Sequence, residues 1–390
     1  PWSRSIPTRQ GAAWAAALAP VDAQWTWPSS CWRSPRWSCD DGAPAPSLRM
    51  LRDPSRKSIE TPWALAIDAE LHAVFGERLA PHAELHVVRT SADLRRLSAP
   101  NLRGMILRTE QGVDPPLCAR FPALAVIATA SAGTDHIDAA PGIQVLDAGG
   151  GNADGVADWV VLTLLRRFGL EGARPRVGVL GCGNTGARVA RRLHTLGFPL
   201  VLVDPPRARR ESRFTSAPLD ALFDTEVLSV HVPLNPRGTE DQTEAWLDAA
   251  RIAAWRRPFH LLNAARGPVV DETAAQEALE SGALASWSAD VLVNEQSPDP
   301  ALLSALALVT PHIAGRSDDG RRGLQRRCLD AVARAFGLAL EALADLPALT
   351  LPCPTFEEVW PFLDRLSGLP SVDAHLRAAP STYKSLRHAH

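Results

Sequence analysis

The sequence predicts an α/β protein built on two doubly wound parallel sheets. Strand patterns alternate with helix patterns from Trp63 to Gly315, and this alternation is typical of parallel sheets that helices cover on both faces. A strongly apolar helix pattern at residues 154–169 divides the series into two parts. The second part opens with a glycine-rich turn at residues 181–186, between a strand and a helix. We therefore expect two Rossmann-like domains.

The composition is that of an ordinary globular protein. The chain has 390 residues, of which 46% are hydrophobic and 22% are charged, enough for two or three domains with large cores. Its net charge of -2 gives no electrostatic basis for binding nucleic acid or an anionic membrane. No apolar run approaches the roughly 20 residues that a bilayer crossing needs.

The cysteines point to a reducing compartment. The six of them are scattered without CxxC or CxH spacing, which argues against a zinc site and against a disulfide framework. We therefore expect a cytoplasmic protein with no metal.

The first sixty residues differ from the rest of the chain. Half of the twelve tryptophans fall within the first 37 residues, mixed with Pro, Ser and Arg and without periodicity. Such a segment is either an aromatic partner-binding tail or lies outside the fold, upstream of a start at Met50. The second interpretation is favoured, so residues 1–60 are predicted to be disordered or a non-native extension.

The first series of strands predicts one sheet. A strand pattern at 63–68 runs into a helix pattern at 69–80. Further strand patterns follow at 83–88, 104–109, 124–131 and 143–148. In the helix pattern at 154–169, the apolar residues Val156, Trp159, Val160 and Leu164 form one stripe. A helix of this kind commonly leads from one domain to the next.

The next stretch carries a dinucleotide fingerprint. The turn after the strand at 176–180 contains Gly181, Gly183 and Gly186, with Asn184 and Thr185 between them. The first glycine permits the tight turn, the second lets the backbone approach a pyrophosphate, and the third lets the helix pack closely on the strand. The helix N-terminus offers N–H groups to the phosphates.

An acidic residue at the end of the following strand favours NAD over NADP. Asp204 follows the glycine turn at the sequence separation expected of a carboxylate that binds the adenosine ribose. Arg207, Arg209 and Arg210 follow it and leave a 2′-phosphate site as an alternative, or a solvated loop. The carboxylate outweighs the arginines, and NAD is the predicted cofactor.

Four polar residues follow the later strands. Arg266, Asp290, Glu295 and His312 each come just after a strand pattern, where ligands of open α/β sheets bind. Oxidation of a 2-hydroxy acid by NAD needs a base for the hydroxyl proton and a cation for the carboxylate. Histidine with a neighbouring carboxylate suits the first task and arginine the second. By itself, a lone histidine after Thr-Pro is more often a packing residue, but the position of His312 after the last strand favours the base.

Several motifs together resemble those of the D-isomer-specific 2-hydroxyacid dehydrogenases. They are, in the order of that family, GCGNTG…VDPP, HVPL, NAARGPVVD, ADVLVNEQ and TPHIAG. Within the family, ATASAGTDHID, GGGNADGVADWV and the C-terminal DAHLRAAPSTYKSLRHAH resemble the subgroup that oxidises 4-phosphoerythronate in pyridoxal 5′-phosphate synthesis. The resemblance extends from about Pro62 to the end.

The resemblance implies a role for each matching residue. Arg266 matches the catalytic arginine, Glu295 the catalytic acid and His312 the proton donor and acceptor. The three glycines of the turn, together with Asn184 and Thr185, match positions that contact NAD. Further positions that match NAD contacts are Asp204, Val232, Ala264, Ala265, Asp290 and Gly315. Thr109 and Ser131 match substrate-binding positions, and Arg108 next to Thr109 is either a phosphate ligand or a surface salt bridge.

The sequence departs from the family pattern at four places. Val232 and Ser131 each stand where the family usually has Thr, and Gln296 replaces Pro after the catalytic acid. Arg316 stands where the subgroup has a substrate-contacting Tyr. An arginine still suits an anionic substrate, but these departures weaken the inference of phosphoerythronate.

The family pattern also implies the domain limits. We expect a substrate-binding domain at 61–152, an NAD-binding domain at 153–311 and a return helix at 312–340. Residues 341–390 resemble a truncated dimerisation domain, and a homodimer is expected, held mainly by the cofactor domain.

Three functions remain open. The first is NAD-dependent oxidation of 4-phosphoerythronate at C2. The second is the same chemistry on another D-2-hydroxy acid, such as glycerate or 3-phosphoglycerate, or reduction of a 2-ketoacid. The third is a non-catalytic, NAD-sensing binding protein on the same fold.

Overall fold

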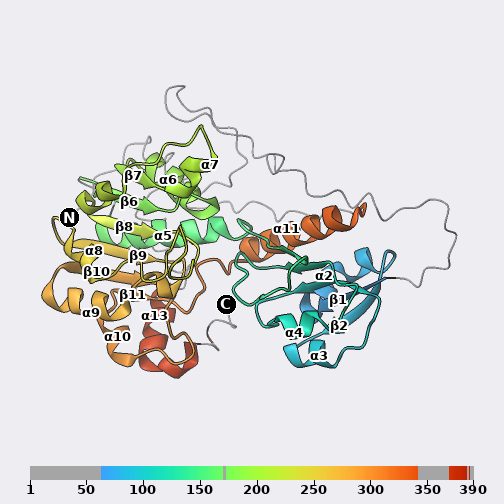
Figure 1. Cartoon of the computed structure of the whole chain (residues 1–390). Coiled ribbons are helices and arrows are strands. Elements are labelled where there is room, and N and C mark those ends of the chain that lie inside the picture. The colour runs from blue at the N-terminus through green and yellow to red at the C-terminus, as the bar shows by residue number, and fades with distance from the viewer. Residues whose placement is uncertain (1–62, 170–172, 341–368, 384–385, 387–390) are drawn as a thin grey trace, which may run out of the picture.

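The chain folds into two lobes, each a parallel sheet between helices (Figure 1). The computed structural model describes residues 63–169, 173–340, 369–383 and 386. The predicted fold class is confirmed, because the two sheets have five and six strands and every strand pair is parallel. The prediction for residues 1–60 lies outside the described residues.

The first lobe contains the five-stranded sheet, in the order β2-β1-β3-β4-β5. Its strands are β1 Ala64–Asp68, β2 Glu84–Val88, β3 Leu102–Leu107, β4 Val126–Thr129 and β5 Gln144–Leu146. Its helices are α2 Ala69–Leu79, α3 Ser91–Arg96 and α4 Pro115–Cys118. Helix α2 begins where it does because the Asp68 carboxylate accepts hydrogen bonds from the N–H groups of Glu70 and Leu71.

The second lobe contains the six-stranded sheet, in the order β11-β10-β9-β8-β6-β7. Its strands are β6 Val177–Leu180, β7 Leu200–Val203, β8 Val227–Val230, β9 Phe259–Asn263, β10 Leu284–Ala289 and β11 Leu308–Val309. Its helices include α5 Ala153–Phe168, α6 Asn184–Thr195, α7 Pro205–Arg210, α8 Ala249–Ala253, α9 Glu272–Ser281 and α10 Pro300–Ala305.

The strand order places a ligand crevice in this second sheet. The chain moves from β6 outward to β7, then returns to β8 on the other side of β6 and continues in that direction. The connections on the two sides therefore lie on opposite faces, and a crevice opens between the carboxyl ends of β6 and β8. The glycine-rich turn follows β6, so the topology places it at that crevice.

Two segments of chain connect the lobes and pack against each other through glycines. A Cβ added to Gly151 would lie 2.5 Å from the backbone nitrogen of Leu324, and one added to Gly323 would lie 2.1 Å from the carbonyl oxygen of Gly151. Gly323 and Leu324 belong to the second segment, helix α11, Asp318–Phe336, which returns to the first lobe (Figure 1). There the Phe336 ring stacks on Trp63 with centroids 4.7 Å apart. The numerical domain limits stay a prediction.

A C-terminal helix lies on the second lobe, beside β11 and α10 (Figure 1, red). This helix, α13 Leu369–Ala378, falls within the segment that the sequence assigned to dimerisation. Leu376 and Tyr383 are buried in the core that contains Trp287 and Phe259. In this chain, therefore, part of the C-terminal segment completes the core of the second lobe; the dimer remains a prediction.

Among the described residues, no helix combines the length and the apolar character that crossing a membrane requires.

Three cysteines provide a first test of the packing. Cys118, Cys182 and Cys328 are free thiols and at most 3% exposed, and burial raises the pKa of both Cys182 and Cys328 to about 12. Because the thiolate is the reactive form, iodoacetamide at pH 8 should leave all three unmodified in the folded protein and modify them in denaturant. Peptide mass spectrometry measures this, and rapid labelling of Cys182 in the folded protein would contradict the packing of the glycine turn.

Candidate active site

The glycine turn is shaped by close backbone contacts. Gly181 has a φ of +85°, and a Cβ there would lie 2.6 Å from the carbonyl oxygen of His231. A Cβ on Gly186 would lie 1.9 Å from the carbonyl oxygen of Gly181. By contrast, nothing lies within 4 Å of a Cβ placed on Gly183. The fold itself thus requires Gly181 and Gly186, whereas Gly183 leaves space beside the backbone.

The N-terminus of α6 faces that space without a side-chain cap. The N-cap residue is Gly183, which has no side chain that could accept hydrogen bonds from the first turn. The first N–H groups of the helix are therefore available to an anion. Asn184 and Thr185 form the first two positions of the helix, and the exposed Asn184 lies against Gly150 of the segment between the lobes. This arrangement fits the pyrophosphate of a dinucleotide.

Asp204 closes the turn from the end of β7. One of its oxygens accepts a hydrogen bond from the Cys182 N–H at 2.8 Å, and the other accepts from the Arg207 N–H at 2.8 Å. The carboxylate is half-buried beside the glycine turn, as the fingerprint predicts. Its contact with a ribose stays a prediction.

Of the three arginines after Asp204, Arg207 is buried, whereas Arg209 and Arg210 are exposed. Arg207 is 7% exposed, donates to the Cys182 carbonyl oxygen at 2.5 Å and lies over the Phe214 ring at 4.4 Å. It is buried because residues 205–210 form helix α7, which turns the side chain back under the glycine turn. The solvated-loop alternative is therefore wrong for Arg207. Arg209 is paired with Asp241 at 2.6 Å.

His312 and Glu295 form a direct pair. The Nδ1 atom of His312 lies 2.9 Å and 3.1 Å from the two carboxylate oxygens of Glu295. The His312 side chain is 31% exposed and the Glu295 side chain 22%, so a ligand can reach the imidazole. The carboxylate fixes the ring and leaves Nε2 as the nitrogen that can exchange a proton with a ligand.

A buried carboxylate holds the loop that carries His312. The oxygens of Asp290, which is 1% exposed, accept hydrogen bonds from the Thr310 hydroxyl and from the N–H groups of Ile313 and Ala314. The Asp290 carbonyl accepts from the His312 N–H at 2.7 Å. Burial raises the pKa of Asp290, and His312 and these donors oppose the rise. The structure thus gives Asp290 a loop-holding role, and its contact with NAD stays a prediction.

Two further groups support this loop from outside it. Trp159 in α5 donates from Nε1 to the Thr310 hydroxyl at 3.1 Å. The hydroxyl of Tyr383, beyond α13, donates to the Asp290 carbonyl at 3.2 Å. His312 itself has a φ of +58°, a left-handed conformation that a residue with a side chain adopts at a cost. These surrounding hydrogen bonds hold it there.

Arg266 follows β9 and reaches across to the first lobe. Its Nε and Nη2 atoms donate to one oxygen of Asp135, at 3.0 Å and 2.9 Å, and Nη1 donates to the Ala265 carbonyl at 2.8 Å. The buried Asn263 side chain holds the backbone here: it donates to the Arg266 carbonyl and accepts from the Ala265 N–H. Ala264, which lies between Asn263 and Ala265 in the chain, is half-buried.

The predicted catalytic residues follow three neighbouring strands. Arg266 comes after β9, Glu295 after β10 and His312 after β11, and these strands are adjacent in the sheet. The structure joins Glu295 to His312 directly, and it places Arg266 at the same edge with its guanidinium on Asp135. Val232 follows β8 and lies against the glycine turn, where its Cγ1 would be 2.9 Å from a Cβ on Gly181.

The predicted substrate residues lie at the carboxyl edge of the first sheet. Ser131 is 9% exposed, donates to the Gly133 carbonyl at 2.6 Å and shares a hydrogen bond with Thr129. His136 contacts the same Thr129 hydroxyl, and burial lowers the pKa of that histidine. In the structure Ser131 therefore shapes its loop, and substrate contact through it stays a prediction.

Arg108 lies among carboxylates. It forms ion pairs with Asp68 at 3.0 Å, Glu70 at 2.6 Å and Glu110 at 3.7 Å. This network agrees with the salt-bridge alternative for Arg108, although its partner Asp68 is buried. Thr109 beside it is exposed.

Gly315 and Arg316 end the His312 loop. A Cβ on Gly315 would lie 2.3 Å from the side-chain nitrogen of Asn152, so the position accepts only glycine without a shift. Arg316 follows, half-buried.

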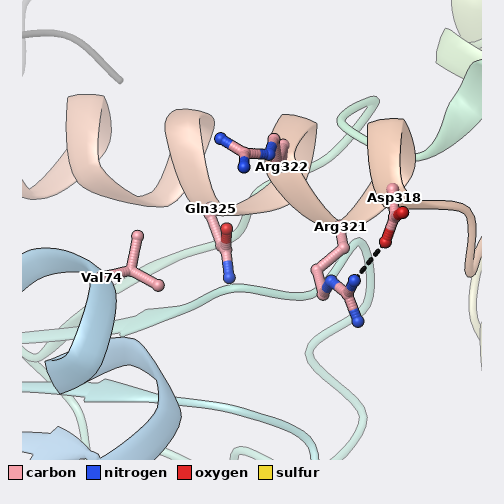
Figure 2. Close-up of a pocket in the computed structure, with 5 residues that line it drawn as sticks. All are labelled: Val74, Asp318, Arg321, Arg322 and Gln325. Atoms are coloured by element: carbon pink, nitrogen blue, oxygen red, sulfur yellow. Dashed lines mark hydrogen bonds and ion pairs between the residues drawn. The ribbon is translucent and has the colours of Figure 1, made fainter. Parts of the chain in front are cut away.

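A separate cavity lies outside this site. It has a volume of about 400 Å³ and lies between α2 and α11, lined by Val74, Asp318, Arg321, Arg322 and Gln325. Figure 2 shows Arg321 turned toward Asp318, with which it forms an ion pair. None of the predicted site residues lines the cavity, so we assign it no role in the chemistry.

Within the part of the chain that the structure describes, no three His, Cys, Asp or Glu side chains are grouped so as to hold a metal ion.

Asp135, Asn263 and Thr310 were missed by sequence reasoning. Asn263 and Thr310 are polar residues at the ends of buried strands, and that signal was present in the sequence. Asp135 belongs to the ATASAGTDHID motif, but its partner Arg266 lies far away along the chain, so no local pattern connects them.

Comparisons with known proteins agree with this geometry. Residues 158–314 match the model of the D-isomer specific 2-hydroxyacid dehydrogenase, NAD binding domain. Erythronate-4-phosphate dehydrogenase of Salinibacter ruber is 40% identical over 245 residues, which are 60% of this chain and 62% of that protein. The Aeromonas hydrophila protein of the same name is 35% identical over 302 residues, 75% of this chain and 77% of that one.

The chain belongs to the D-isomer-specific 2-hydroxyacid dehydrogenase family.

The match to the Salinibacter protein spans less than two thirds of that protein's length. Among solved structures, the D-lactate dehydrogenase of Aquifex aeolicus complexed with NAD and lactic acid has the same fold. Its TM-score is 0.55 at 21% identity, over 70% of this chain and 96% of that one.

Family membership identifies the cofactor as NAD. The matched NAD-binding domain contains the glycine turn, Asp204, Asp290 and the residues up to Ala314. The open space at Gly183 and the uncapped N-terminus of α6 fit NAD.

The glycines of the turn give a paired prediction. Gly186→Ala should lower the free energy of unfolding by about 1–3 kcal/mol, because its Cβ overlaps the Gly181 carbonyl. Gly183→Ala should leave the fold nearly as stable but weaken NADH binding, because its Cβ enters the space that the pyrophosphate needs. Thermal unfolding and NADH fluorescence measure the two effects. An unchanged NADH affinity in a folded Gly183→Ala variant would place the pyrophosphate elsewhere.

Proposed function

We propose that the protein oxidises 4-phospho-D-erythronate at C2 to 2-oxo-3-hydroxy-4-phosphobutanoate, with NAD as the acceptor. The observation that carries this proposal is the His312–Glu295 pair, which lies at the same sheet edge as Arg266 in a domain of the NAD-binding type. A base, a carboxylate that supports it and a cation for a carboxylate are the groups that 2-hydroxy acid oxidation needs.

His312 acts as the base. When bound, NAD supplies the acceptor for the hydride that leaves C2. His312 takes the proton of the C2 hydroxyl on Nε2 while its Nδ1 remains on Glu295. The Glu295 carboxylate stabilises the imidazolium that results, so the C2 oxygen becomes a carbonyl without a proton being released directly into water.

Arg266 binds the substrate carboxylate. A guanidinium stays charged at all relevant pH values and donates in a planar fork, which suits a carboxylate beside the reacting carbon. Its hold on the carboxylate orients C2 and its hydroxyl relative to His312.

The observations on the relatives and on the site bear differently on the identity of the substrate. Relatives at 35–40% identity are named erythronate-4-phosphate dehydrogenase, and this supports a phosphorylated acid. Arg316 and Ser131 differ from that subgroup's pattern, and Arg108 is already paired with three carboxylates. These features favour the second candidate, another D-2-hydroxy acid such as glycerate or 3-phosphoglycerate, or reduction of a 2-ketoacid.

We further propose a cytoplasmic homodimer.

A substrate panel separates these candidates. NADH formation at 340 nm should be fastest with 4-phosphoerythronate, compared at equal concentration with D-glycerate and 3-phosphoglycerate. A preference for an unphosphorylated acid would replace the first candidate with the second. No turnover with any acid, in either direction, would leave the NAD-sensing role.

Variants of the proposed base and cation test the mechanism. His312→Gln should lower kcat about 10²–10⁴-fold, because a positioned general base contributes about that factor. Arg266→Ala should abolish turnover, and Arg266→Lys should retain part of it, because lysine keeps the charge but not the fork. NADH affinity, measured by fluorescence, should be unchanged in all three. Near-normal turnover in His312→Gln would exclude His312 as the base.

A further inference from the structure

Asp135 and Arg266 form a contact between the two lobes. Arg266 follows β9 of the second sheet, and Asp135 lies in the loop after β4 of the first. The Nε and Nη2 atoms donate to the same oxygen of Asp135, at 3.0 Å and 2.9 Å. Two parallel N–H groups on one carboxylate fix the plane of the guanidinium as well as its position.

The loop around Asp135 is shaped to admit the guanidinium. A Cβ added to Gly133 would lie 1.9 Å from Nη2 of Arg266 and 2.7 Å from the bonded oxygen of Asp135. Only glycine leaves room for the pair at this position. On the other side, Nη1 donates to the Ala265 carbonyl. The guanidinium is thus held on two sides by two different lobes.

This arrangement leaves donors for a ligand. A guanidinium has five N–H groups, and the contacts of Arg266 with Asp135 and Ala265 use three of them. One hydrogen on each terminal nitrogen remains without an acceptor among the described residues. Those two hydrogens are the ones that a substrate carboxylate can use while Asp135 stays in place.

Stability alone does not account for the pair. The Asp135 side chain is 55% exposed and that of Arg266 28%, and ion pairs at such exposure contribute little to folding. The partner of Asp135 is, however, the arginine to which the proposed function assigns the substrate carboxylate.

We propose that Asp135 is a positioning residue for Arg266. It holds the guanidinium so that its remaining N–H groups face the substrate carboxylate. Because the two residues belong to different lobes, Asp135 positions Arg266 only while the lobes are packed as they are in this structure. This inference rests on the proposed function of Arg266.

The first test replaces the charge and keeps the shape. Asp135→Asn should raise the KM for the hydroxy acid about tenfold and lower kcat severalfold, because a hydrogen bond to a charged group contributes about that factor. The KM for NAD should be unchanged. The matched control is Asp138→Asn, an exposed aspartate three positions further along the same loop, which should leave both parameters unchanged. Equal effects in the two variants would overturn the proposal.

A double-mutant cycle tests whether Asp135 acts through Arg266. In the Arg266→Lys background, Asp135→Asn should have little further effect, because the fork that it positions is gone. Additive effects would mean that Asp135 acts independently of Arg266 and would overturn the proposal.

A binding measurement separates this inference from the proposed function. Oxalate, a small dicarboxylate, should bind the wild-type enzyme with NADH about tenfold more tightly than it binds Asp135→Asn with NADH, as read from NADH fluorescence. Equal or tighter binding to the variant would show that Asp135 competes with the ligand, and would overturn the proposal. Weaker binding to the variant, in a protein that oxidises no hydroxy acid, would support the positioning role and reject the proposed function.

Discussion

The site depends on one buried carboxylate. Asp290 is almost completely buried, and a carboxylate in that position is tolerated only when its oxygens are occupied by donors. Here the donors are the Thr310 hydroxyl and two backbone N–H groups of the loop that follows β11. Satisfying the carboxylate therefore also fixes the loop, and His312 is held in a left-handed conformation with its ring on Glu295.

Glycines provide the corresponding constraint on the cofactor side and between the lobes. Gly186 allows α6 to approach the turn, and Gly151 and Gly323 allow the two connecting segments to pack backbone against backbone. A methyl group at any of these positions would collide with main-chain atoms, which cannot rotate away as a side chain can. Gly133 likewise has no side chain, and this leaves room for the guanidinium of Arg266, which links the two lobes.

Polar residues that the family pattern associates with ligands make structural contacts within this chain. Ser131 bonds its own loop, Arg108 is paired with acids and Asp290 holds the His312 loop. Such contacts fix the shape of a site before any ligand arrives, which lowers the cost of ordering it on binding. Arg207 departs from the sequence-based interpretation in another way. A solvated loop was one alternative for this residue, but its side chain is buried beneath the glycine turn.

By itself the sequence determined the fold class, the NAD fingerprint and the three strand ends that carry Arg266, Glu295 and His312. These follow from periodicity and from the rule that parallel strands bring their carboxyl ends to one edge, both of which are local in the chain. Only the tertiary structure decided that Asp135 meets Arg266 and that α13 completes the second lobe. Those contacts join residues far apart in sequence, where spacing carries no information about distance. The Asp135–Arg266 contact depends in addition on how the two lobes pack against each other.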